Sequence, residues 1–312
     1  MKFALVFPGQ GSQSVGMMAA YGDSPVIRQT FEEASEALGE DLWAMAAEGP
    51  AERLAQTVNT QPLMLTAGVA VYRAWLAAGG PSPDMVAGHS LGEYSALVAA
   101  GALKFADAVP LVRFRAAAMQ AAVPAGHGAM AALLGLDAEA VIAVCAEAAG
   151  DEVVEAANLN APGQIVIAGA AAAVDRAMAL AKSRGAKRAV LLPVSAPFHC
   201  ALMKPAAEQL AGRLAEVEIS APSIPVVNNV DVAICTDPAQ IRDALVRQAY
   251  SPVRWIESLE AMAGQGVGAV IECGPGKVLA GLTKRIVKEV QGGAIVDQAS
   301  LNESVALVKE NA

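Results

Sequence analysis

Short apolar runs alternate with longer segments of helical spacing along most of the chain. Residues 2–7 (KFALVF) and 84–88 (DMVAG) are short, apolar and followed or closed by proline or glycine, a pattern typical of buried strands. Apolar positions in residues 60–78, 91–101 and 105–123 recur every three or four residues, which predicts helices. Strands that alternate with helices in this way favour a mainly parallel α/β sheet.

The pattern changes between residues 126 and 196, where strands and helices follow in a different order. We predict strands at 128–136, 153–160, 164–169 and 188–195, and helices at 137–150 and 171–185. The order βαββαβ is that of the ferredoxin-like unit. The sequence therefore predicts a small ferredoxin-like domain of residues 126–196, inserted into a large α/β domain of residues 1–125 and 197–312.

The α/β pattern resumes after the predicted insert. It continues with an apolar segment at 224–230 (IPVVNNV), helices around 238–264, a strand at 267–274 (VGAVIECG) and a helix at 276–290. These elements would complete the large domain.

Composition places the protein among globular chains. It has 312 residues, 54% of them hydrophobic, and a mean hydropathy of +0.41. Charged residues, proline or glycine nevertheless interrupt every apolar segment before about 18 residues accumulate, so no spanning helix is predicted. The start imitates a signal peptide, but its apolar run stops at Pro8 and no small-residue cleavage site follows. Four widely spaced cysteines without a Cys-x-x-Cys pair suit reduced thiols, and we expect a cytoplasmic protein.

The charge balance argues against two classes of partner. The net charge is −9, from 31 acidic and 22 basic residues, and the basic residues form no cluster along the chain. Nucleic acids and anionic membrane surfaces attract proteins with a basic patch. We therefore expect no nucleic-acid partner and no membrane partner.

A serine stands between two glycines where the strand at 84–88 meets the following helix. Gly88-His89-Ser90-Leu91-Gly92 matches the nucleophile-elbow pattern G-x-S-x-G in its required strand–turn–helix context. Glycines permit the sharp turn, and a helix beginning at Leu91 would favour an oxyanion beside Ser90. We interpret Ser90 as a nucleophile; the alternative is a packed turn that simply requires small residues.

A serine nucleophile needs a base, and the chain has only three histidines. His89 neighbours Ser90 on a sharp turn, where adjacent side chains point apart, so it suits a structural hydrogen bond. His127 lies between two glycines at the predicted domain junction and is interpreted as a solvated loop residue. His199 lies where the chain re-enters the large domain, at a junction that would form a cleft. We predict that His199 is the general base.

No acidic third partner is evident for His199. None of the Asp and Glu residues between Ser90 and His199 occupies a convincing loop after a strand of the large domain. A backbone carbonyl or a neutral amide could orient the imidazole instead, which would make the site a Ser-His dyad.

Two glycine-rich loops resemble nucleotide-binding motifs but depart from them. Residues 7–13 (FPGQGSQ) fail the dinucleotide pattern because Ser14 occupies the third glycine position, and residues 274–277 (GPGK) fail the Walker pattern. We assign no nucleotide to either loop. The first loop is better interpreted as a close-approach loop whose amide at Gln10 completes an oxyanion hole with the amide of Leu91.

Two arginines follow the elbow on the next predicted helix. Arg113 and Arg115 are two residues apart, and at about 100° per residue they point to nearly opposite sides. At most one of them can therefore face Ser90. An arginine aimed at the serine suits a substrate that bears a carboxylate, because the planar guanidinium pairs with it bidentately.

Seven ordered motifs spread over nearly the full chain resemble one enzyme family. The sequence is similar to the malonyl-CoA:acyl-carrier-protein transacylases of bacterial fatty-acid synthesis in FPGQGSQ (7–13), NTQP (59–62), GHSLGEYSALVAAG (88–101), R-x-x-x-M-Q (115–120), NLNAPGQIVIAG (158–169), PVSAPFHC (193–200) and ECGPGKVL (272–279). The family's fold is a hydrolase-like α/β core with a mainly parallel sheet and a ferredoxin-like insert, which agrees with the pattern described above.

The resemblance implies a reaction and several roles. Ser90 would take malonyl from malonyl-CoA as an ester and pass it to the phosphopantetheine thiol of acyl carrier protein, with His199 as base and then acid. It selects Arg115 over Arg113 for the malonyl carboxylate, and the amides of Gln10 and Leu91 for the oxyanion. It implies no bound cofactor or metal, and it allows a monomer.

The resemblance bears on two further residues. Gln248 matches the residue whose backbone carbonyl holds the catalytic imidazole, which would account for the missing acid. Phe198 departs from members that carry serine before the histidine. In related polyketide acyltransferase domains an aromatic residue there accompanies malonyl over methylmalonyl, although Phe198 is equally interpreted as a hydrophobic wall residue.

Three other functions stay open at this point. The same elbow serves serine esterases and thioesterases, against which Arg115 and the missing acid argue. The chain could instead be a carrier-docking module with a silent site, against which the intact Ser90, His199 and Arg115 argue. It could also be an acyltransferase that serves a polyketide synthase in trans, which its carrier preference would reveal.

Overall fold

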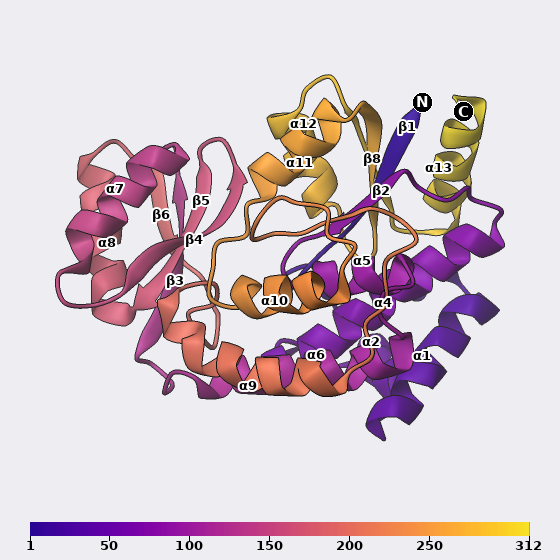
Figure 1. Ribbon diagram of the computed structural model, residues 1–312, viewed down its shortest axis with the longest axis horizontal. Coiled ribbons are helices and arrows are strands. Elements are labelled where there is room, and N and C mark those ends of the chain that lie inside the picture. The colour runs from indigo at the N-terminus through magenta and orange to yellow at the C-terminus, as the bar shows by residue number, and fades with distance from the viewer. Residues whose placement is uncertain (312) are drawn as a thin grey trace.

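Two separate β-sheets organise the chain in the computed structural model, which describes residues 1–311 (Figure 1). The larger is a five-stranded parallel sheet of order β7-β2-β1-β8-β9. Its strands are β1 (Lys2–Phe7), β2 (Met85–Gly88), β7 (Val226–Val227), β8 (Val267–Cys273) and β9 (Gln291–Ile295). The helices around it are α1 (Pro25–Leu38), α2 (Leu42–Glu48), α3 (Ala51–Leu54), α4 (Thr57–Ala77), α5 (Gly92–Ala99), α6 (Phe105–Ala121), α9 (Lys204–Glu216), α10 (Pro238–Gln248), α11 (Trp255–Gly264), α12 (Val278–Ile286) and α13 (Gln298–Glu310), with short 3₁₀ turns η1 (Ala19–Tyr21) and η2 (Ala201–Met203).

Strand β1 lies in the middle of the parallel sheet because it is apolar on both faces. Phe3, Leu5 and Phe7 belong to the core shared with helices α1, α4, α5 and α6. Ala4 and Val6 point to the other face, into a second core with α11 and α12. A strand covered by helices on both sides carries a continuous apolar run, as KFALVF does.

The carboxyl ends of β1 and β2 lie side by side and set the position of two loops. Phe7 pairs with Gly88 in a parallel register, and the backbone N–H of His89 donates to the Phe7 carbonyl at 3.0 Å. The glycine loop after β1 and the G-x-S-x-G turn after β2 therefore leave the sheet next to each other. The carboxyl edge of a parallel sheet is where ligands of α/β proteins bind.

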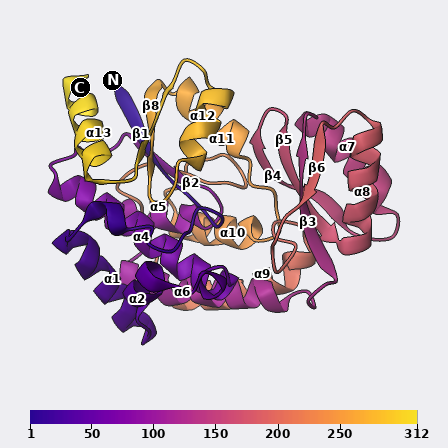
Figure 2. The same cartoon turned by 180° about the vertical axis from the view of Figure 1, so that it is seen from behind.

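The smaller sheet is antiparallel and four-stranded, of order β4-β5-β3-β6. Its elements are β3 (Gly128–Leu134), α7 (Ala138–Ala149), β4 (Val154–Ala161), β5 (Gln164–Ala170), α8 (Ala171–Ser183) and β6 (Arg188–Leu191). Helices α7 and α8 pack on one face of this sheet and enclose a core of their own. Figures 1 and 2 show this unit to one side of the parallel sheet.

The two sheets are joined through the edge strand β4. The N–H of Val253 donates to the carbonyl of Ala157 at 2.8 Å, and the N–H of Leu159 donates to the carbonyl of Val253 at 2.9 Å. The segment between α10 and α11 therefore covers the edge of β4, which would otherwise present unpaired backbone groups. This contact also fixes the chain shortly after Gln248.

Most predicted elements occur in the structure, with differences toward their ends. The strand expected at 188–195 ends at Leu191, because Pro193 has no N–H to continue the ladder. The helix expected at 276–290 is shorter, Val278–Ile286, and Val287 and Val290 pack in the core beyond it. The hydrophobic pattern predicts no element in the stretches that form α9, β9 and α13.

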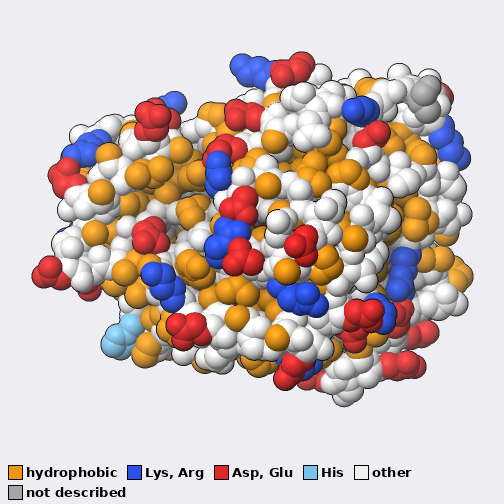
Figure 3. All heavy atoms as spheres, in the orientation of Figure 1, with side chains coloured by type: hydrophobic (Ala, Val, Ile, Leu, Met, Phe, Trp, Pro, Cys, Tyr) orange, Lys and Arg blue, Asp and Glu red, His pale blue; other side chains and the backbone are white. Residues whose placement is uncertain are grey.

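On the face drawn in Figure 3, basic and acidic side chains are scattered among apolar ones rather than gathered by sign. Within residues 1–311, no helix combines the length and the apolarity that crossing a membrane requires. All four cysteines are free thiols; three are buried and Cys235 is partly exposed.

Candidate active site

Ser90 lies in a tight turn that only glycine neighbours allow. Its backbone is left-handed, with φ of 51°, which is uncommon for a residue with a side chain. A Cβ on Gly88 would lie 1.8 Å from the carbonyl carbon of Gly92, and a Cβ on Gly92 would lie 2.0 Å from the Phe7 carbonyl oxygen. The two glycines thus let the turn close on itself and on β1, and Ser90 stays partly exposed above the sheet edge.

His199 faces Ser90 across the site. Its Nε2 lies 2.7 Å from Ser90 Oγ, and its Nδ1 lies 2.9 Å from the backbone carbonyl oxygen of Gln248. Because a carbonyl only accepts, Nδ1 carries the proton and Nε2 is left to accept from the Ser90 hydroxyl. Burial, together with the nearby Arg115, lowers the pKa of His199 to about 3. The imidazole is therefore neutral at neutral pH, and its Nε2 is unprotonated and free to accept the serine proton.

The orienting group for His199 is a backbone carbonyl and no carboxylate. Gln248 is the last residue of α10 and is fully buried. Its side chain also contributes: Nε2 donates to the Ser90 carbonyl at 3.0 Å, and Oε1 accepts from Arg115 at 2.9 Å. One residue therefore contacts the serine, the histidine and the arginine of the site.

Arg115 is buried next to Ser90, whereas Arg113 points away from it. Arg115 is 1% exposed, and its Nη2 lies 3.2 Å from Ser90 Oγ. Arg113 instead forms a two-pronged ion pair with Glu40, at 2.9 and 3.3 Å. The two arginines lie on opposite sides of α6, as their spacing requires.

The partners of Arg115 are neutral. Its Nη1 donates to Gln61 Oε1 at 2.9 Å, and its Nη2 donates to Gln248 Oε1. Among the described residues its hydrogen-bond partners are Gln61, Ser90 and Gln248 and include no carboxylate, and its Nε has no hydrogen-bond partner. A buried guanidinium without a carboxylate retains both charge and donors for an anion.

The two amides expected to form an oxyanion hole come from adjoining loops. Across residues 1–311, neither the Gln10 nor the Leu91 N–H donates to a protein acceptor. The loops touch closely, since a Cβ on Gly9 would lie 2.5 Å from the His89 carbonyl oxygen. The side chain of Gln10 is held by a hydrogen bond from its Nε2 to Thr57 Oγ1, 3.2 Å long. Both amides therefore have no acceptor among the described residues, and they lie on loops that contact each other.

The remaining candidates have structural surroundings. His89 Nε2 lies 2.8 Å from Asn160 Oδ1 on β4, and its ring packs against Trp255. His127 is an exposed loop residue. Phe198 is 9% exposed and belongs to the main core.

The sequence patterns do not predict a role at the site for three polar residues that the structure places there. Asn229 Oδ1 accepts from the Ser90 N–H at 2.7 Å, Glu93 accepts from Asn229 and Gln248, and Gln61 holds Arg115. Each is at most 2% exposed. Their signal was a polar residue inside an apolar segment, in NTQP, GHSLGE and VVNNV. Among residues 1–311, no three His, Cys, Asp or Glu side chains are placed to hold a metal ion.

Comparison with known proteins places this geometry in a family. A family model described as acyl transferase domain matches residues 4–311. The Escherichia coli K12 malonyl CoA-acyl carrier protein transacylase is 57% identical over 98% of this chain and 99% of its own length. The enzyme of that name from Bacillus subtilis is 48% identical over 99% and 98%. The chain belongs to the malonyl CoA-acyl carrier protein transacylase family.

Solved structures of this transacylase family agree with the fold. The acyl-carrier-protein S-malonyltransferase of Burkholderia pseudomallei is 62% identical, with a TM-score of 0.97 over 98% of this chain and 100% of that one. A malonyl transacylase solved in complex with a type II polyketide synthase acyl carrier protein is 52% identical, with a TM-score of 0.97 and the same coverage. The mixed α/β architecture with one parallel and one antiparallel sheet is thus that of the transacylases.

Proposed function

We propose that this protein transfers malonyl from malonyl-CoA to the phosphopantetheine thiol of acyl carrier protein. The observation that carries the proposal is Arg115, a buried guanidinium without a carboxylate partner in residues 1–311. It lies 3.2 Å from a serine that is itself hydrogen-bonded to a neutral histidine. The Ser-His pair supports acyl transfer, and the guanidinium supports an acyl group that ends in a carboxylate. The names of the relatives support the same substrate and acceptor.

The first half-reaction loads the serine. His199 Nε2 takes the proton of Ser90 Oγ as Oγ attacks the thioester carbonyl carbon of malonyl-CoA. The amides of Gln10 and Leu91 donate to the oxyanion of the tetrahedral intermediate. The intermediate collapses with cleavage of the carbon–sulfur bond, and the coenzyme A sulfur leaves with the proton from His199. Malonyl is then held as an ester on Ser90.

The second half-reaction runs the same steps toward the carrier. His199 takes the proton of the phosphopantetheine thiol, and the sulfur attacks the ester carbonyl. The carbon–oxygen bond to Ser90 then breaks, and His199 returns the proton to Oγ. The Gln248 carbonyl stabilises the imidazolium formed in each half because Nδ1–H donates to it. Arg115 holds the malonyl carboxylate throughout, and we assign Phe198 to the wall of the acyl pocket.

The domain arrangement is part of the same proposal. We divide the chain into a large hydrolase-like domain, residues 1–125 and 197–312, and a small ferredoxin-like domain, residues 126–196. The order β3-α7-β4-β5-α8-β6 and the antiparallel sheet order β4-β5-β3-β6 support the second assignment. The site then lies where the chain returns to the large domain, with His199 just past the boundary.

Two alternatives use the same residues. A serine esterase or thioesterase would pass the acyl group to water instead of to a thiol, and the buried Arg115 would favour an acyl group with a carboxylate in that reaction too. An acyltransferase of polyketide synthesis would differ in its carrier, and one related structure contains such a carrier protein. The two biosynthetic roles share one chemistry at Ser90.

Intact-mass analysis tests the proposal directly. Mixing the protein with malonyl-CoA should add one malonyl group, and holo acyl carrier protein should then remove it and gain it. Ser90→Ala should abolish the adduct. Release of malonate without transfer to the carrier would establish a hydrolase instead, and a persistent adduct in Ser90→Ala would refute the nucleophile. Parallel trials with fatty-acid and polyketide carriers distinguish the two biosynthetic roles.

A further inference from the structure

One carboxylate oxygen lies at the centre of the hydrogen bonds behind the Ser90 turn. Glu93 is in the first turn of α5 and is 2% exposed. Its Oε2 accepts from the backbone N–H of Asn229 and from Nε2 of Gln248, each at 2.9 Å. A single acceptor therefore fixes two residues that come from different segments of the chain.

The first of these residues restrains the nucleophile. Asn229 Oδ1 accepts from the Ser90 N–H at 2.7 Å, and its Nδ2 donates to the Gly88 carbonyl at 2.8 Å. Ser90 has left-handed backbone, a conformation that persists only where surrounding contacts hold it. Because Glu93 holds the Asn229 backbone, it also fixes the position of the Asn229 side-chain amide, which is hydrogen-bonded to the Ser90 turn.

The second residue orients the arginine. A carboxylate accepts only, so Glu93 forces the NH₂ end of the Gln248 amide toward itself. The carbonyl end is then turned toward Arg115, from which Oε1 accepts at 2.9 Å. With the amide reversed, an NH₂ group would face the guanidinium and Arg115 would lose an acceptor. The orientation of Gln248, and through it the position of Arg115, thus depends on Glu93.

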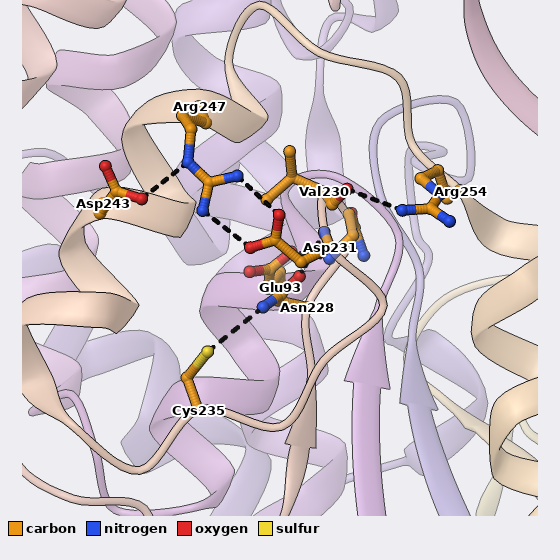
Figure 4. A network of polar contacts seen from close by, with 9 residues as sticks. Glu93, Asn228, Val230, Asp231, Cys235, Asp243, Arg247 and Arg254 are labelled. Carbon is orange, nitrogen blue, oxygen red and sulfur yellow. Dashed lines mark hydrogen bonds and ion pairs between the residues drawn. The ribbon is translucent and has the colours of Figure 1, made fainter.

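The same two segments are also joined on the outside, but more weakly. Figure 4 shows Arg247, the residue before Gln248, in a two-pronged ion pair with Asp231, at 2.7 and 2.7 Å. The side chains of Arg247 and Asp231 are 32% and 39% exposed, and such exposed pairs contribute little. The buried carboxylate is therefore the main restraint between them.

We propose that Glu93 is a positioning residue for acyl transfer, a shared hydrogen-bond acceptor that holds the Ser90 turn through Asn229 and the Arg115 guanidinium through Gln248. This inference rests on the proposed function. Burial raises the pKa of Glu93 to about 7, against the hydrogen bonds from Gln248 and Asn229 that lower it. Neutral and charged forms both present an oxygen, so acceptor geometry carries the role more than charge does.

The test compares Glu93 variants by the rate of malonyl-enzyme formation at saturating malonyl-CoA and by the preference for malonyl-CoA over acetyl-CoA. Glu93→Ala should slow acylation by about 10²-fold, as displacements of about 1 Å in a site do, and should reduce the malonyl preference. Glu93→Gln keeps an oxygen that can accept both bonds, and it should restore most of the rate and preference. A purely structural role would not change the preference between the two acyl groups.

Glu272 provides the matched control, since it is also a fully buried glutamate and contacts neither Asn229 nor Gln248. Glu272→Gln should leave the malonyl preference unchanged. Should Glu93→Ala not fold, Glu93→Asp keeps the charge and withdraws the oxygen by one methylene, and its folded form should acylate slowly. The inference is overturned by wild-type kinetics in folded Glu93→Ala or Glu93→Asp, or by Glu93→Gln as slow as Glu93→Ala. The proposed function would fail differently, because the wild-type protein itself would form no malonyl adduct.

Discussion

Ser90 and His199 are both held in left-handed backbone, and their side chains meet with Oγ 2.7 Å from Nε2. The φ angles are 51° and 61°, values that side-chain-bearing residues rarely adopt. Strain of this kind persists where the surrounding structure fixes it, commonly at functional sites. Here the fixing contacts are the Asn229 hydrogen bond to the Ser90 N–H and the Gln248 carbonyl on His199.

The low pKa of His199 predicts an unusual acid limb. Burial and then Arg115 lower this pKa to about 3, so the base stays neutral well below the ordinary histidine value of 6.5. We expect kcat/KM for malonyl-CoA to show no inflection near pH 6.5 and to fall only at lower pH. Rates measured between pH 5 and 8 in the folded enzyme check this. An acid limb of kcat/KM centred near pH 6.5 would contradict the assignment.

Removal of the neighbouring charge should move that limb. Arg115 lowers the pKa of His199 because a positive neighbour disfavours the imidazolium. In Arg115→Gln the acid limb of kcat/KM for acetyl-CoA should therefore shift to higher pH.

The low pKa of His199 also makes folding stability depend on pH. Because the pKa is about 3 in the folded protein and near 6.5 in the unfolded chain, the unfolded chain is protonated first on acidification. This contribution to the free energy of unfolding therefore falls as pH drops from 6.5 toward 3.

The two arginines of α6 offer a matched pair of variants. Arg115→Ala should lower kcat/KM for malonyl transfer on the order of 10²-fold more than for acetyl transfer, since hydrogen bonds to a charged group contribute about 1.5–3 kcal/mol each. Arg113→Ala removes only the partly exposed pair with Glu40 and should change neither rate substantially. Steady-state kcat/KM values of both variants with malonyl-CoA and with acetyl-CoA measure these effects. Equal losses for malonyl and acetyl in Arg115→Ala would argue against a carboxylate clamp.

Local signals explain why part of this site could be read from the sequence. Ser90 lies in a turn with a fixed glycine pattern, and the three histidines left a short search for the base. The spacing of Arg113 and Arg115 determined that they diverge. Each of these inferences needs only neighbouring residues or a helical period.

The remaining part depends on contacts between distant segments. Asn229 and Gln61 are neutral amides whose roles arise from partners 139 and 54 residues away. Glu93 was visible as an acid near Ser90, yet nothing local indicated that it holds Asn229 and Gln248 instead of the histidine. Strand β9 contains Gly292 and Gly293, which weaken any strand signal, and its pairing with β8 defines it instead.

Glu272 predicts a pH-dependent stability that is independent of catalysis. It is fully buried on β8, its Oε2 accepts from the Ala280 N–H at 2.9 Å, and its Oε1 has no partner among the described residues. Burial raises its pKa from 4.5 to about 7. The native state therefore binds more protons than the unfolded state between these values, and this contribution to the free energy of unfolding is lost as pH rises.

Glu272→Gln removes this titration. Relative to the wild-type protein, the variant should gain stability as pH rises from about 5 to 8, on the order of 3 kcal/mol, because one pKa unit corresponds to about 1.4 kcal/mol. Urea unfolding of both proteins at several pH values measures the difference. A difference that stays constant with pH would show that Glu272 does not titrate in this range.

Phe198 permits a test of acyl selectivity. It precedes His199 and is 9% exposed within the main core. The proposed function assigns its ring to the wall of the acyl pocket. Phe198→Ser should raise methylmalonyl transfer relative to malonyl transfer by about 10-fold or more, since crowding one methyl group discriminates by about 1–3 kcal/mol. Truncation of a core phenylalanine also costs about 3–5 kcal/mol of stability, so the ratio is measured on protein shown to be folded. An unchanged ratio in the folded variant would make Phe198 a packing residue only, and selectivity against the extra methyl would then have to arise elsewhere in the acyl pocket.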